Sequence, residues 1–406
     1  MSRTDPPRLA ILGAGPIGLE AAVVARQLKL PLTIYERGRV GEHLLRWGHV
    51  KLFSPMGMNV TPLGRSTVLG RRPDDDLPAD DACITGREHV ERYLAPLAET
   101  LREFLRAETH VLRVGRRNTL KAENPGDAAR AKQPFVLLLR DRNGDRFEEA
   151  DVVLDCTGTY GQHRWLGDGG IPALGELQAE PHIGYALEDV LGNRRGEYAG
   201  KSVLVVGGGY SAATTVCNLA ALAEQDNGTW VTWLARAPHS QPLRRIAGDP
   251  LRERDRLAVR ANNLATRGDA NVEFHAATVV EGVESHGQGR GFHVTTRSAG
   301  KKRGWDFDAI IGNVGYTPDT NLYRELQIHE CYATLGPIKL AASLLGQKSL
   351  DCLKVTSPGP EALRNPEPNF YIIGAKSHGR GSQFLLRFGF DQVRDVFELI
   401  KKDFKL

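Results

Sequence analysis

The chain has 406 residues, which is too long for one ordinary domain and suits two or three, each with its own core. Its hydrophobic content of 41% and charged content of 25% are typical of a soluble globular protein. The formal net charge of +4 is small and the basic residues are interspersed with acids, so the composition does not support nucleic-acid binding. The chain has no apolar stretch of membrane-spanning length and no signal-peptide pattern, so we expect a cytoplasmic protein without a membrane partner.

The first predicted elements are a strand, a glycine-rich turn and a helix. The apolar run 9–12 enters the turn, and a segment with helical periodicity begins near Pro16. In such a turn Gly13 permits the tight bend, Gly15 lets a pyrophosphate approach the backbone, and Gly18 lets the helix pack against the strand. A phosphate group then lies at the positive end of the helix.

A second predicted strand, 32–35, ends at Glu36 and Arg37. A carboxylate at this place accepts hydrogen bonds from an adenosine ribose. Strand, turn, helix and ribose acid together predict a dinucleotide-binding unit.

The next region, 38–72, is broken by Gly and Pro, and we predict loops there. Long loops of this kind often carry function, and this one contains Trp47, His49 and Asn59. Thr85 and Glu88 then have the spacing of a capping box at the start of a helix, which Pro96 would kink or divide.

Two strands are predicted further on, at 135–139 and 147–154, and the second runs into Asp155, Cys156, Thr157 and Gly158. At Ser202 the opening pattern begins again. Gly207, Gly209 and Ala212 stand at the positions that Gly13, Gly15 and Gly18 have in the first copy.

A strand in this second copy, 230–234, ends at Ala235 and Arg236. Arginine at the place of the ribose acid suits a 2′-phosphate, and Arg244 and Arg245 lie nearby in the sequence to reinforce it. The alternative is that Arg236 is a solvated charge at a strand end. Further predicted strands at 272–283, 292–296 and 307–314 repeat the later elements of the first half.

The chain is therefore predicted to be an α/β protein with two Rossmann-like domains, each of three layers. We expect an FAD-binding domain at 1–195 plus 317–406, and an NAD(P)H-binding domain at 196–316 inserted into it. Two such domains in one chain are explained economically if a diffusible nicotinamide delivers hydride to a permanently held cofactor, usually FAD. Glu36 favours FAD on the first domain and Arg236 favours NADPH on the second, with NADH as the alternative. The competing explanation is that the domain was duplicated and that the second copy has lost its ligand.

Three later segments add a family resemblance. They are the CysThrGly of 156–158, the GlyTyrThrPro of 315–318 and the strand PheTyrIleIleGly of 370–374. Together with the two fingerprints they resemble the two-dinucleotide-domain flavoproteins, which include thioredoxin reductases, flavin-containing monooxygenases and ornithine or lysine N-hydroxylases. The resemblance implies that Thr157, Gly158 and Gly374 contact the cofactor.

Within this superfamily three features resemble the monooxygenases. The second fingerprint reads GGGYSA, which adds Tyr210 and Ser211 to the cofactor residues. The stretch SHGRGSQFLL contains His378 and Ser382, and it is similar to a run that N-hydroxylases carry beside the flavin. The stretch LFSPMGMNVTP places Asn59 where flavin-containing monooxygenases have an Asn near the ring.

The chain also departs from these families. The late strand is followed by Ala375 and Lys376, where many reductases have Gly-Asp, and the FxGxxxHxxx(W/Y) signature of monooxygenases is not found. An outlying branch is therefore expected.

The resemblance implies that FAD is reduced by NADPH, reacts with molecular oxygen, and oxygenates the nitrogen or sulfur of a small-molecule substrate. Asn59, His49 and Ser382 are the candidates for a hydrogen bond near the reacting position. Each has a structural alternative: a turn for Asn59, packing for His49, and a helix cap for Ser382. Trp47 is a candidate flavin platform, although packing is the commoner role.

Two other functions are left open. One is a reductase that passes electrons to a disulfide, a quinone or a protein partner, and the other is a non-catalytic redox sensor. The five cysteines form no CxxC pair, so a thioredoxin-type dithiol is not expected. Cys331 and Cys352 could form a redox pair, but we favour ordinary thiols. No metal site is expected, and the apolar C-terminal helix leaves a homodimer open.

Overall fold

The computed structural model describes residues 5–71, 77–267, 271–287, 289–347 and 352–406. The chain forms two compact units, which we call the first unit (Met1–Gln162 with Thr317–Leu406) and the second unit (His163–Tyr316). The predicted domain boundary falls at residue 195. The compact second unit begins earlier because backbone bridges join segment 163–195 to it, for example Leu174 to Gly282 and Gly184 to Ile311.

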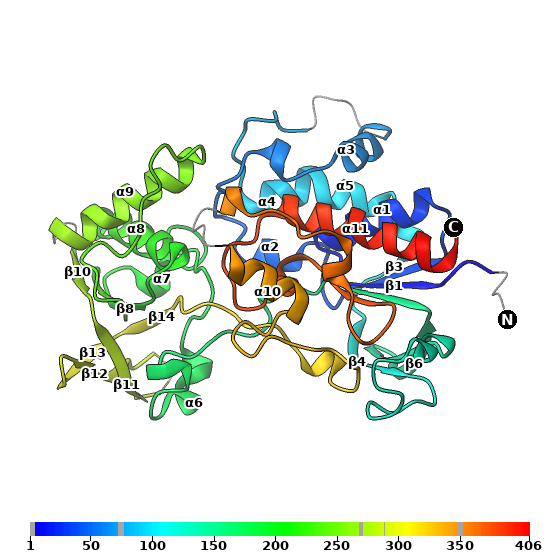
Figure 1. Ribbon diagram of the computed structural model, residues 1–406. Coiled ribbons are helices and arrows are strands. Elements are labelled where there is room, and N and C mark those ends of the chain that lie inside the picture. Colours follow the sequence, from blue (N-terminus) through cyan, green and yellow to red (C-terminus); the bar gives the residue numbers. More distant parts are fainter. Residues whose placement is uncertain (1–4, 72–76, 268–270, 288, 348–351) are drawn as a thin grey trace. The chain divides into compact units, whose positions relative to one another are not determined.

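The first unit is built on a five-stranded parallel sheet in the order β15-β7-β1-β2-β3, of which Figure 1 labels β1 and β3. Its strands are β1 (Leu9–Leu12), β2 (Leu32–Tyr35), β3 (Leu105–Arg106), β7 (Val152–Asp155) and β15 (Phe370–Ile372). A three-stranded antiparallel sheet accompanies it, made of β4 (His110–Arg116), β5 (Phe135–Asp141) and β6 (Gly144–Ala150). The helices of this unit are α1 (Pro16–Gln27), α2 (Glu42–Arg46), α3 (Pro62–Leu69), α4 (Gly86–His89), α5 (Ala95–Glu99), α10 (Ile338–Gly346) and α11 (Leu386–Phe404).

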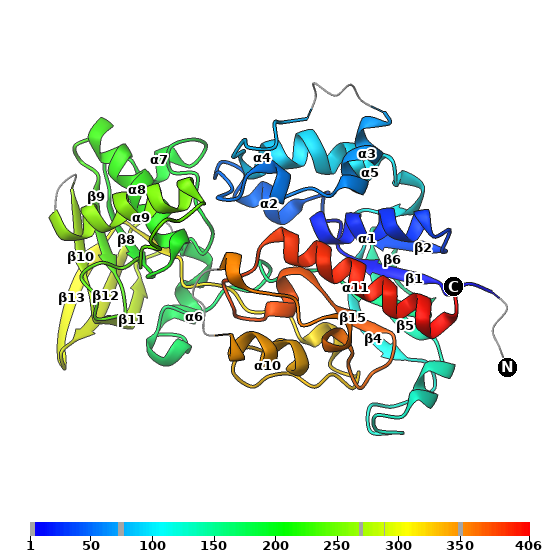
Figure 2. The same cartoon turned by 45° about the horizontal axis from the view of Figure 1, so that its top comes forward.

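The parallel sheet of the first unit lies between helices and the antiparallel sheet. Side chains of a strand point alternately to its two faces, so β1 divides its residues between two cores. Leu9 and Ile11 pack with α1 and α11, whereas Ala10 and Leu12 pack with β4 and β5. Figure 1 shows α1 and α11 on one side of β1 and the strands β4 and β6 on the other, and in the turned view of Figure 2 α11 lies in front.

The second unit repeats this plan. Its parallel sheet has the order β10-β9-β8-β14, and its antiparallel sheet the order β11-β12-β13. The strands are β8 (Ser202–Val206), β9 (Trp230–Leu234), β10 (Val272–His275), β11 (Thr278–Ser285), β12 (Phe292–Ser298), β13 (Lys301–Phe307) and β14 (Ala309–Gly312). The helices are α6 (Glu176–Ala179), α7 (Arg195–Tyr198), α8 (Tyr210–Gln225) and α9 (Arg252–Arg267). Val203 and Val205 of β8 face α8 and α9, whereas Leu204 and Val206 face the antiparallel sheet.

The predicted α/β fold with two three-layer Rossmann-like units is confirmed, and several elements differ in detail. The single strand expected at 147–154 is two strands, β6 and β7, which belong to different sheets. The chain turns between them at Asp151, whose carboxylate accepts a hydrogen bond from the backbone N–H of Arg8 at 3.0 Å.

Region 38–72 was expected to consist of loops, but it contains the eight-residue helix α3, capped by the Thr61 side chain. The predicted capping box of Thr85 and Glu88 is present at α4. Before Pro96 the helix takes a π turn over Val90–Leu94, and Pro96 lies in the first turn of the next α-helical segment. Among the described residues no helix is long and apolar enough to cross a membrane.

Candidate functional site

The glycine loop of the first unit connects β1 to α1 and leaves one side open. Gly13 has φ +102°, and a Cβ built on it would lie 2.9 Å from the carbonyl oxygen of Cys156. A Cβ on Gly18 would lie only 1.9 Å from the carbonyl oxygen of Gly13, so helix and loop are in direct backbone contact. A Cβ on Gly15 would meet nothing within 4 Å. The loop is therefore closed against the protein at Gly13 and Gly18 and open at Gly15.

The open side coincides with the start of α1. Gly15 is the N-cap of this helix, Pro16 is its first residue, and no side chain caps the first turn. The first N–H groups of a helix have no partner within the helix and carry its positive dipole end. An anion can therefore bind here to backbone N–H groups.

Glu36 is held in place directly after β2. Its Oε2 accepts a hydrogen bond from the backbone N–H of Ala14, and its Oε1 accepts one from Gly38, both at 2.8 Å. Each oxygen of a carboxylate has two acceptor positions, so capacity for ribose hydroxyls remains. The next residue, Arg37, has an exposed side chain.

The glycine loop of the second unit, between β8 and α8, has the same geometry at its first two positions. Gly207 has φ +146°, and a Cβ on it would lie 2.4 Å from the carbonyl oxygen of Asn313, while Gly209 is open. The helix begins at Tyr210 and Ser211 without a side-chain cap. The third position is Ala212, which is fully buried.

Arg236 is exposed, two residues after the end of β9, and Arg244 is exposed as well. Neither forms an ion pair within the part of the chain that the structure describes. Arg245 is already engaged, because its guanidinium makes two hydrogen bonds to Asp255 at 2.9 and 3.0 Å. Of these three arginines, Arg236 and Arg244 are therefore available to a phosphate.

Two further segments of the first unit lie beside its glycine loop. Thr157 and Gly158 follow the end of β7, and Gly158 has φ +69°. Gly374 follows β15, has φ +73°, and a Cβ on it would lie 3.2 Å from Ile17 in the first turn of α1. Both segments thus stand at the carboxyl edge of the parallel sheet, where ligands of such folds bind.

His378 is 7% exposed and ends the short turn that begins at Gly374. Its ring lies near those of Phe384 and Phe388, with centroid distances of 5.2 and 6.2 Å. Burial lowers the pKa of His378 to about 4, so the imidazole is neutral near pH 7. Its Nε2 is buried and has no hydrogen-bond partner among the described residues, which fits a position that a polar group of a ligand would satisfy.

Trp47 is half-buried at the end of α2. Its ring lies 6.2 Å from that of Tyr160, which follows Gly158, and His43 lies 5.9 Å from the same tyrosine. The indole Nε1 of Trp47 is buried without a hydrogen-bond partner in the described part of the chain. The sequence interpretation missed His43 and Tyr160, and the position of Tyr160 close after the CysThrGly motif was the available signal.

Asn59 is used by its own turn. Its Oδ1 accepts a hydrogen bond from the Ser54 hydroxyl at 2.8 Å, and its Nδ2 donates to the carbonyl oxygens of Ser54 and Pro55 at 2.9 and 3.1 Å. Both amide hydrogens are therefore occupied, and the side chain is 1% exposed. This geometry agrees with the turn interpretation of Asn59.

The other two catalytic candidates lie on different elements. His49 is half-buried in the loop after α2. Ser382 is exposed, and it does not cap α11, whose N-cap is Leu385 without a side-chain hydrogen bond. The helix-cap alternative for Ser382 is therefore wrong.

Among the described residues no disulfide joins any of the five cysteines. Burial raises the pKa of the Cys156 thiol well above its ordinary value, which makes this sulfur a poor nucleophile. Within the described ranges no group of three His, Cys, Asp or Glu side chains could hold a metal ion.

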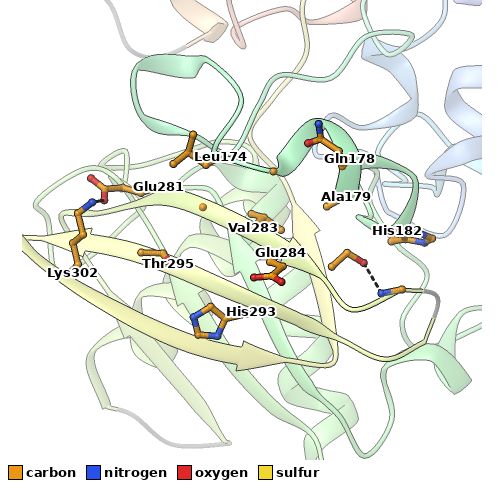
Figure 3. Close-up of a pocket in the computed structure, with 14 residues that line it drawn as sticks. Leu174, Gln178, Ala179, His182, Glu281, Val283, Glu284, His293, Thr295 and Lys302 are labelled. Atoms are coloured by element: carbon orange, nitrogen blue, oxygen red, sulfur yellow. Dashed lines mark hydrogen bonds and ion pairs between the residues drawn. The ribbon is translucent and has the colours of Figure 1, made fainter.

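The second unit also has an open cavity of about 630 Å³ away from its glycine loop. Figure 3 shows it between α6, which contributes Gln178, and the face of the antiparallel sheet, which contributes His293 and Thr295. Glu281 at one end is ion-paired with Arg297 and Lys302. None of the site residues predicted from the sequence lines this cavity.

Comparisons with known proteins give structural matches only. No family model matches the chain, and no curated protein matches it. It is similar to the bacillithiol disulfide reductase of Bacillus cereus, with 15% identity, a TM-score of 0.69, and coverage of 98% of this chain and 100% of that one. It is also similar to the ornithine hydroxylase of Pseudomonas aeruginosa, with 17% identity, a TM-score of 0.61 and coverage of 98% and 99%. A third similar structure is the thioredoxin reductase of Lactococcus lactis, with 14% identity, a TM-score of 0.60, and coverage of 98% of this chain and 99% of that one.

Proposed function

From the fold of the two-dinucleotide-domain flavoproteins, which this chain has, we propose that the protein is an FAD-dependent oxidoreductase that takes hydride from NADPH. One observation carries the proposal: the same open glycine loop occurs in both units, followed by Glu36 in the first and by Arg236 in the second. NADH is the alternative hydride donor.

The two end residues assign the two dinucleotides by charge. A carboxylate such as Glu36 accepts hydrogen bonds from ribose hydroxyls and repels a 2′-phosphate. Arg236 attracts a 2′-phosphate, and a charge-assisted hydrogen bond to it is among the stronger polar contacts. The first unit therefore suits FAD, and the second suits NADPH.

The residues of the first unit fit this cofactor. Its pyrophosphate would bind at Gly15 and the start of α1, and its ribose at Glu36. Thr157, Gly374 and the neutral His378 stand at the same sheet edge, where the unpartnered Nε2 of His378 would meet a polar group of the cofactor. When bound, FAD supplies the hydride acceptor, while the protein orients it and excludes water.

The cofactor assignment is tested by purification and titration. We expect the protein to be yellow or to become yellow with added FAD, and NADPH to bleach it without oxygen faster than NADH does. A protein that takes up no FAD at micromolar concentration would contradict both enzyme interpretations, the monooxygenase and the reductase, and would leave the non-catalytic redox sensor.

For the second half of the reaction we propose transfer of one oxygen atom from O₂ to the nitrogen or sulfur of a small substrate. In the balanced reaction the substrate, O₂, NADPH and a proton give the oxygenated product, water and NADP⁺. The supporting observation is that the sequence contains no CxxC pair and that burial raises the pKa of the Cys156 thiol, the cysteine beside the glycine loop, so a dithiol relay is not favoured. Asn59 has no amide hydrogen left to donate in this step.

The oxygen-transfer proposal is tested with a panel of amines, thiols and thioethers. NADPH consumption, oxygen uptake, hydrogen peroxide release and product are measured in the same reactions. One product per NADPH supports the proposal, whereas quantitative hydrogen peroxide with every substrate counts against it.

A reductase is the second candidate function, because a solved disulfide reductase resembles this chain more closely in structure than a solved hydroxylase does. The bacillithiol disulfide reductase of Bacillus cereus has a TM-score of 0.69, whereas the ornithine hydroxylase of Pseudomonas aeruginosa and the thioredoxin reductase of Lactococcus lactis have scores of 0.61 and 0.60. Steady NADPH oxidation without oxygen, driven by a disulfide or a quinone, would establish it. If neither a disulfide nor a quinone supports NADPH oxidation, the reductase function is excluded.

A further inference from the structure

A buried ion pair lies at the carboxyl edge of the parallel sheet of the first unit. Lys376 is 1% exposed and Asp155 is fully buried, and Nζ lies 2.6 Å from Oδ2. Asp155 is the last residue of β7, and Lys376 follows β15, the neighbouring strand, whose Ile372 is in register with Asp155. The pair therefore stands where ligands of this fold bind, and at the place where the sequence departs from the reductases.

Thr157 closes the pair into a cycle. The Lys376 ammonium donates a hydrogen bond to the Thr157 hydroxyl at 3.0 Å, and this hydroxyl donates to Asp155 Oδ1 at 2.7 Å. The backbone N–H of Thr157 donates to the same oxygen at 3.1 Å. The ammonium also lies 5.1 Å from the centroid of the Tyr323 ring. Its contacts are thus internal, and any effect on a ligand must pass through the segments that it joins.

Both joined segments touch the glycine loop. After Asp155, Cys156 hydrogen-bonds through its N–H to the carbonyl oxygen of Leu12 at 2.9 Å, and its own carbonyl faces Gly13. Before Lys376, Gly374 lies against Ile17 in the first turn of α1. The cycle consequently ties together the two segments that flank the start of α1.

We propose that Lys376 is a positioning residue for FAD: the cycle of Lys376, Asp155 and Thr157 holds segments 155–158 and 374–378 in the arrangement that binds the cofactor. The inference rests on the proposed FAD site of the first unit. Desolvating two charges is costly, and apolar side chains of similar volume often replace both partners of such a pair without loss of stability, whereas removal of one partner alone leaves a buried unpaired charge and is destabilising. The role of the Lys376–Asp155 pair is therefore to specify the arrangement of segments 155–158 and 374–378.

The same strand offers a control at its other end. Glu367 precedes β15 and forms equally buried ion pairs with Arg130 and Arg116, all three side chains being 0% exposed. Oε2 lies 2.7 Å from Arg130 Nη2, and Oε1 lies 2.8 Å from Arg116 Nη2. The Arg130–Glu367 pair lies at the amino end of the strand, away from the edge where ligands bind. Its loss should weaken the fold without disturbing the proposed cofactor site.

The experiment compares Lys376→Met with Arg130→Met. The dissociation constant for FAD is measured by fluorescence titration of the full chain, together with the visible circular dichroism of the bound flavin and the thermal midpoint. We expect Lys376→Met to raise the dissociation constant at least about tenfold and to change the flavin dichroism. Arg130→Met should lower the thermal midpoint and leave the dissociation constant within about twofold of the unaltered protein.

Thr157→Val keeps the proposal testable if Lys376→Met does not fold. It removes the hydroxyl from the cycle and leaves the ion pair, so we expect a rise in the dissociation constant of about threefold or more. Unchanged FAD binding in the folded cycle variants, or an equal loss in Arg130→Met, would overturn the inference. Failure of the unaltered protein to bind FAD would instead overturn the proposed function.

Discussion

The two glycine loops have the same plan but different room for a side chain. In each, the first glycine faces a carbonyl oxygen, at 2.9 Å for a Cβ on Gly13 and 2.4 Å for one on Gly207, and the second glycine is open. At the third position a Cβ on Gly18 would meet the Gly13 carbonyl oxygen at 1.9 Å, whereas the second loop has a buried Ala212. Backbone therefore packs on backbone in the first loop, and the second loop accepts a methyl group.

The residues after the second strand of each unit differ as well. Glu36 is held by two backbone N–H groups of its own unit, whereas Arg236 is exposed and forms no ion pair among the described residues. A pre-arranged acceptor suits a cofactor that stays bound, because no ordering is needed on binding. An exposed arginine suits a dinucleotide that binds and dissociates in each catalytic cycle.

Exchanging the third loop residues should have the largest effect. Gly18→Ala forces a methyl group against the Gly13 carbonyl, and we expect a loss of about 3 kcal/mol or more of unfolding free energy and purification without FAD. The reciprocal Ala212→Gly should cost only about 1 kcal/mol. Chemical denaturation and the flavin content of the two variants check this contrast, and equal losses would show that the two loops do not differ in packing.

Removing the arginine of the second unit should separate the two nicotinamides. Arg236→Gln deletes a charge-assisted contact, so we expect the KM for NADPH to rise about 10- to 100-fold while that for NADH changes little. Initial rates of flavin reduction with each donor measure it. Arg245→Gln is the control, because Arg245 is already paired with Asp255. Similar losses with both nicotinamides would remove the 2′-phosphate role of Arg236.

Glu36→Gln tests the other half of the comparison. The amide retains one acceptor oxygen, so one of the two backbone hydrogen bonds and the charge are lost. We expect FAD to bind about tenfold more weakly, with the KM for NADPH unchanged. Fluorescence titration gives the first value and initial rates the second. An effect on NADPH alone would reverse the assignment of the two units.

The smallest effect concerns pH and the first unit. Burial lowers the pKa of His378 from 6.5 to about 4, so the unfolded chain binds a proton there between these values while the folded one does not. Its contribution to stability is present above pH 6.5 and is lost as the pH falls toward 4. In His378→Gln the slope of unfolding free energy against pH should decrease by about one proton in this window. Denaturant titrations from pH 7 to 4 measure it, and an unchanged slope would exclude His378 as a contributor.

Local patterns predicted much of the framework. The predicted strands 32–35 and 230–234, the return of the opening pattern at Ser202, the start of α1 at Pro16 and the capping box at α4 agree with the structure. These features depend on alternation, glycine turns and caps, which act over a few neighbouring residues. The single strand expected at 147–154 was wrong, because the division at Asp151 depends on Arg8, more than a hundred positions away in the chain.

The site shows the same division. The open glycine loops could be identified from spacing alone, because each loop is one continuous segment. The roles of Asn59 and Ser382 could not, since their hydrogen bonds and exposure depend on the turns around them. Lys376 was visible only as a departure from a motif, and its partner Asp155 lies on another strand.

The sequence by itself determined that this chain has two dinucleotide-type loops of opposite end charge, because glycine positions, periodicity and a strand-end residue are local properties. Only the tertiary structure decided that Gly18 has no room for a methyl group, that Glu36 is clamped, and that a buried lysine closes a cycle at the sheet edge. These features arise where segments far apart in the chain are packed together, and there the distance between atoms, rather than the residue type, decides the outcome.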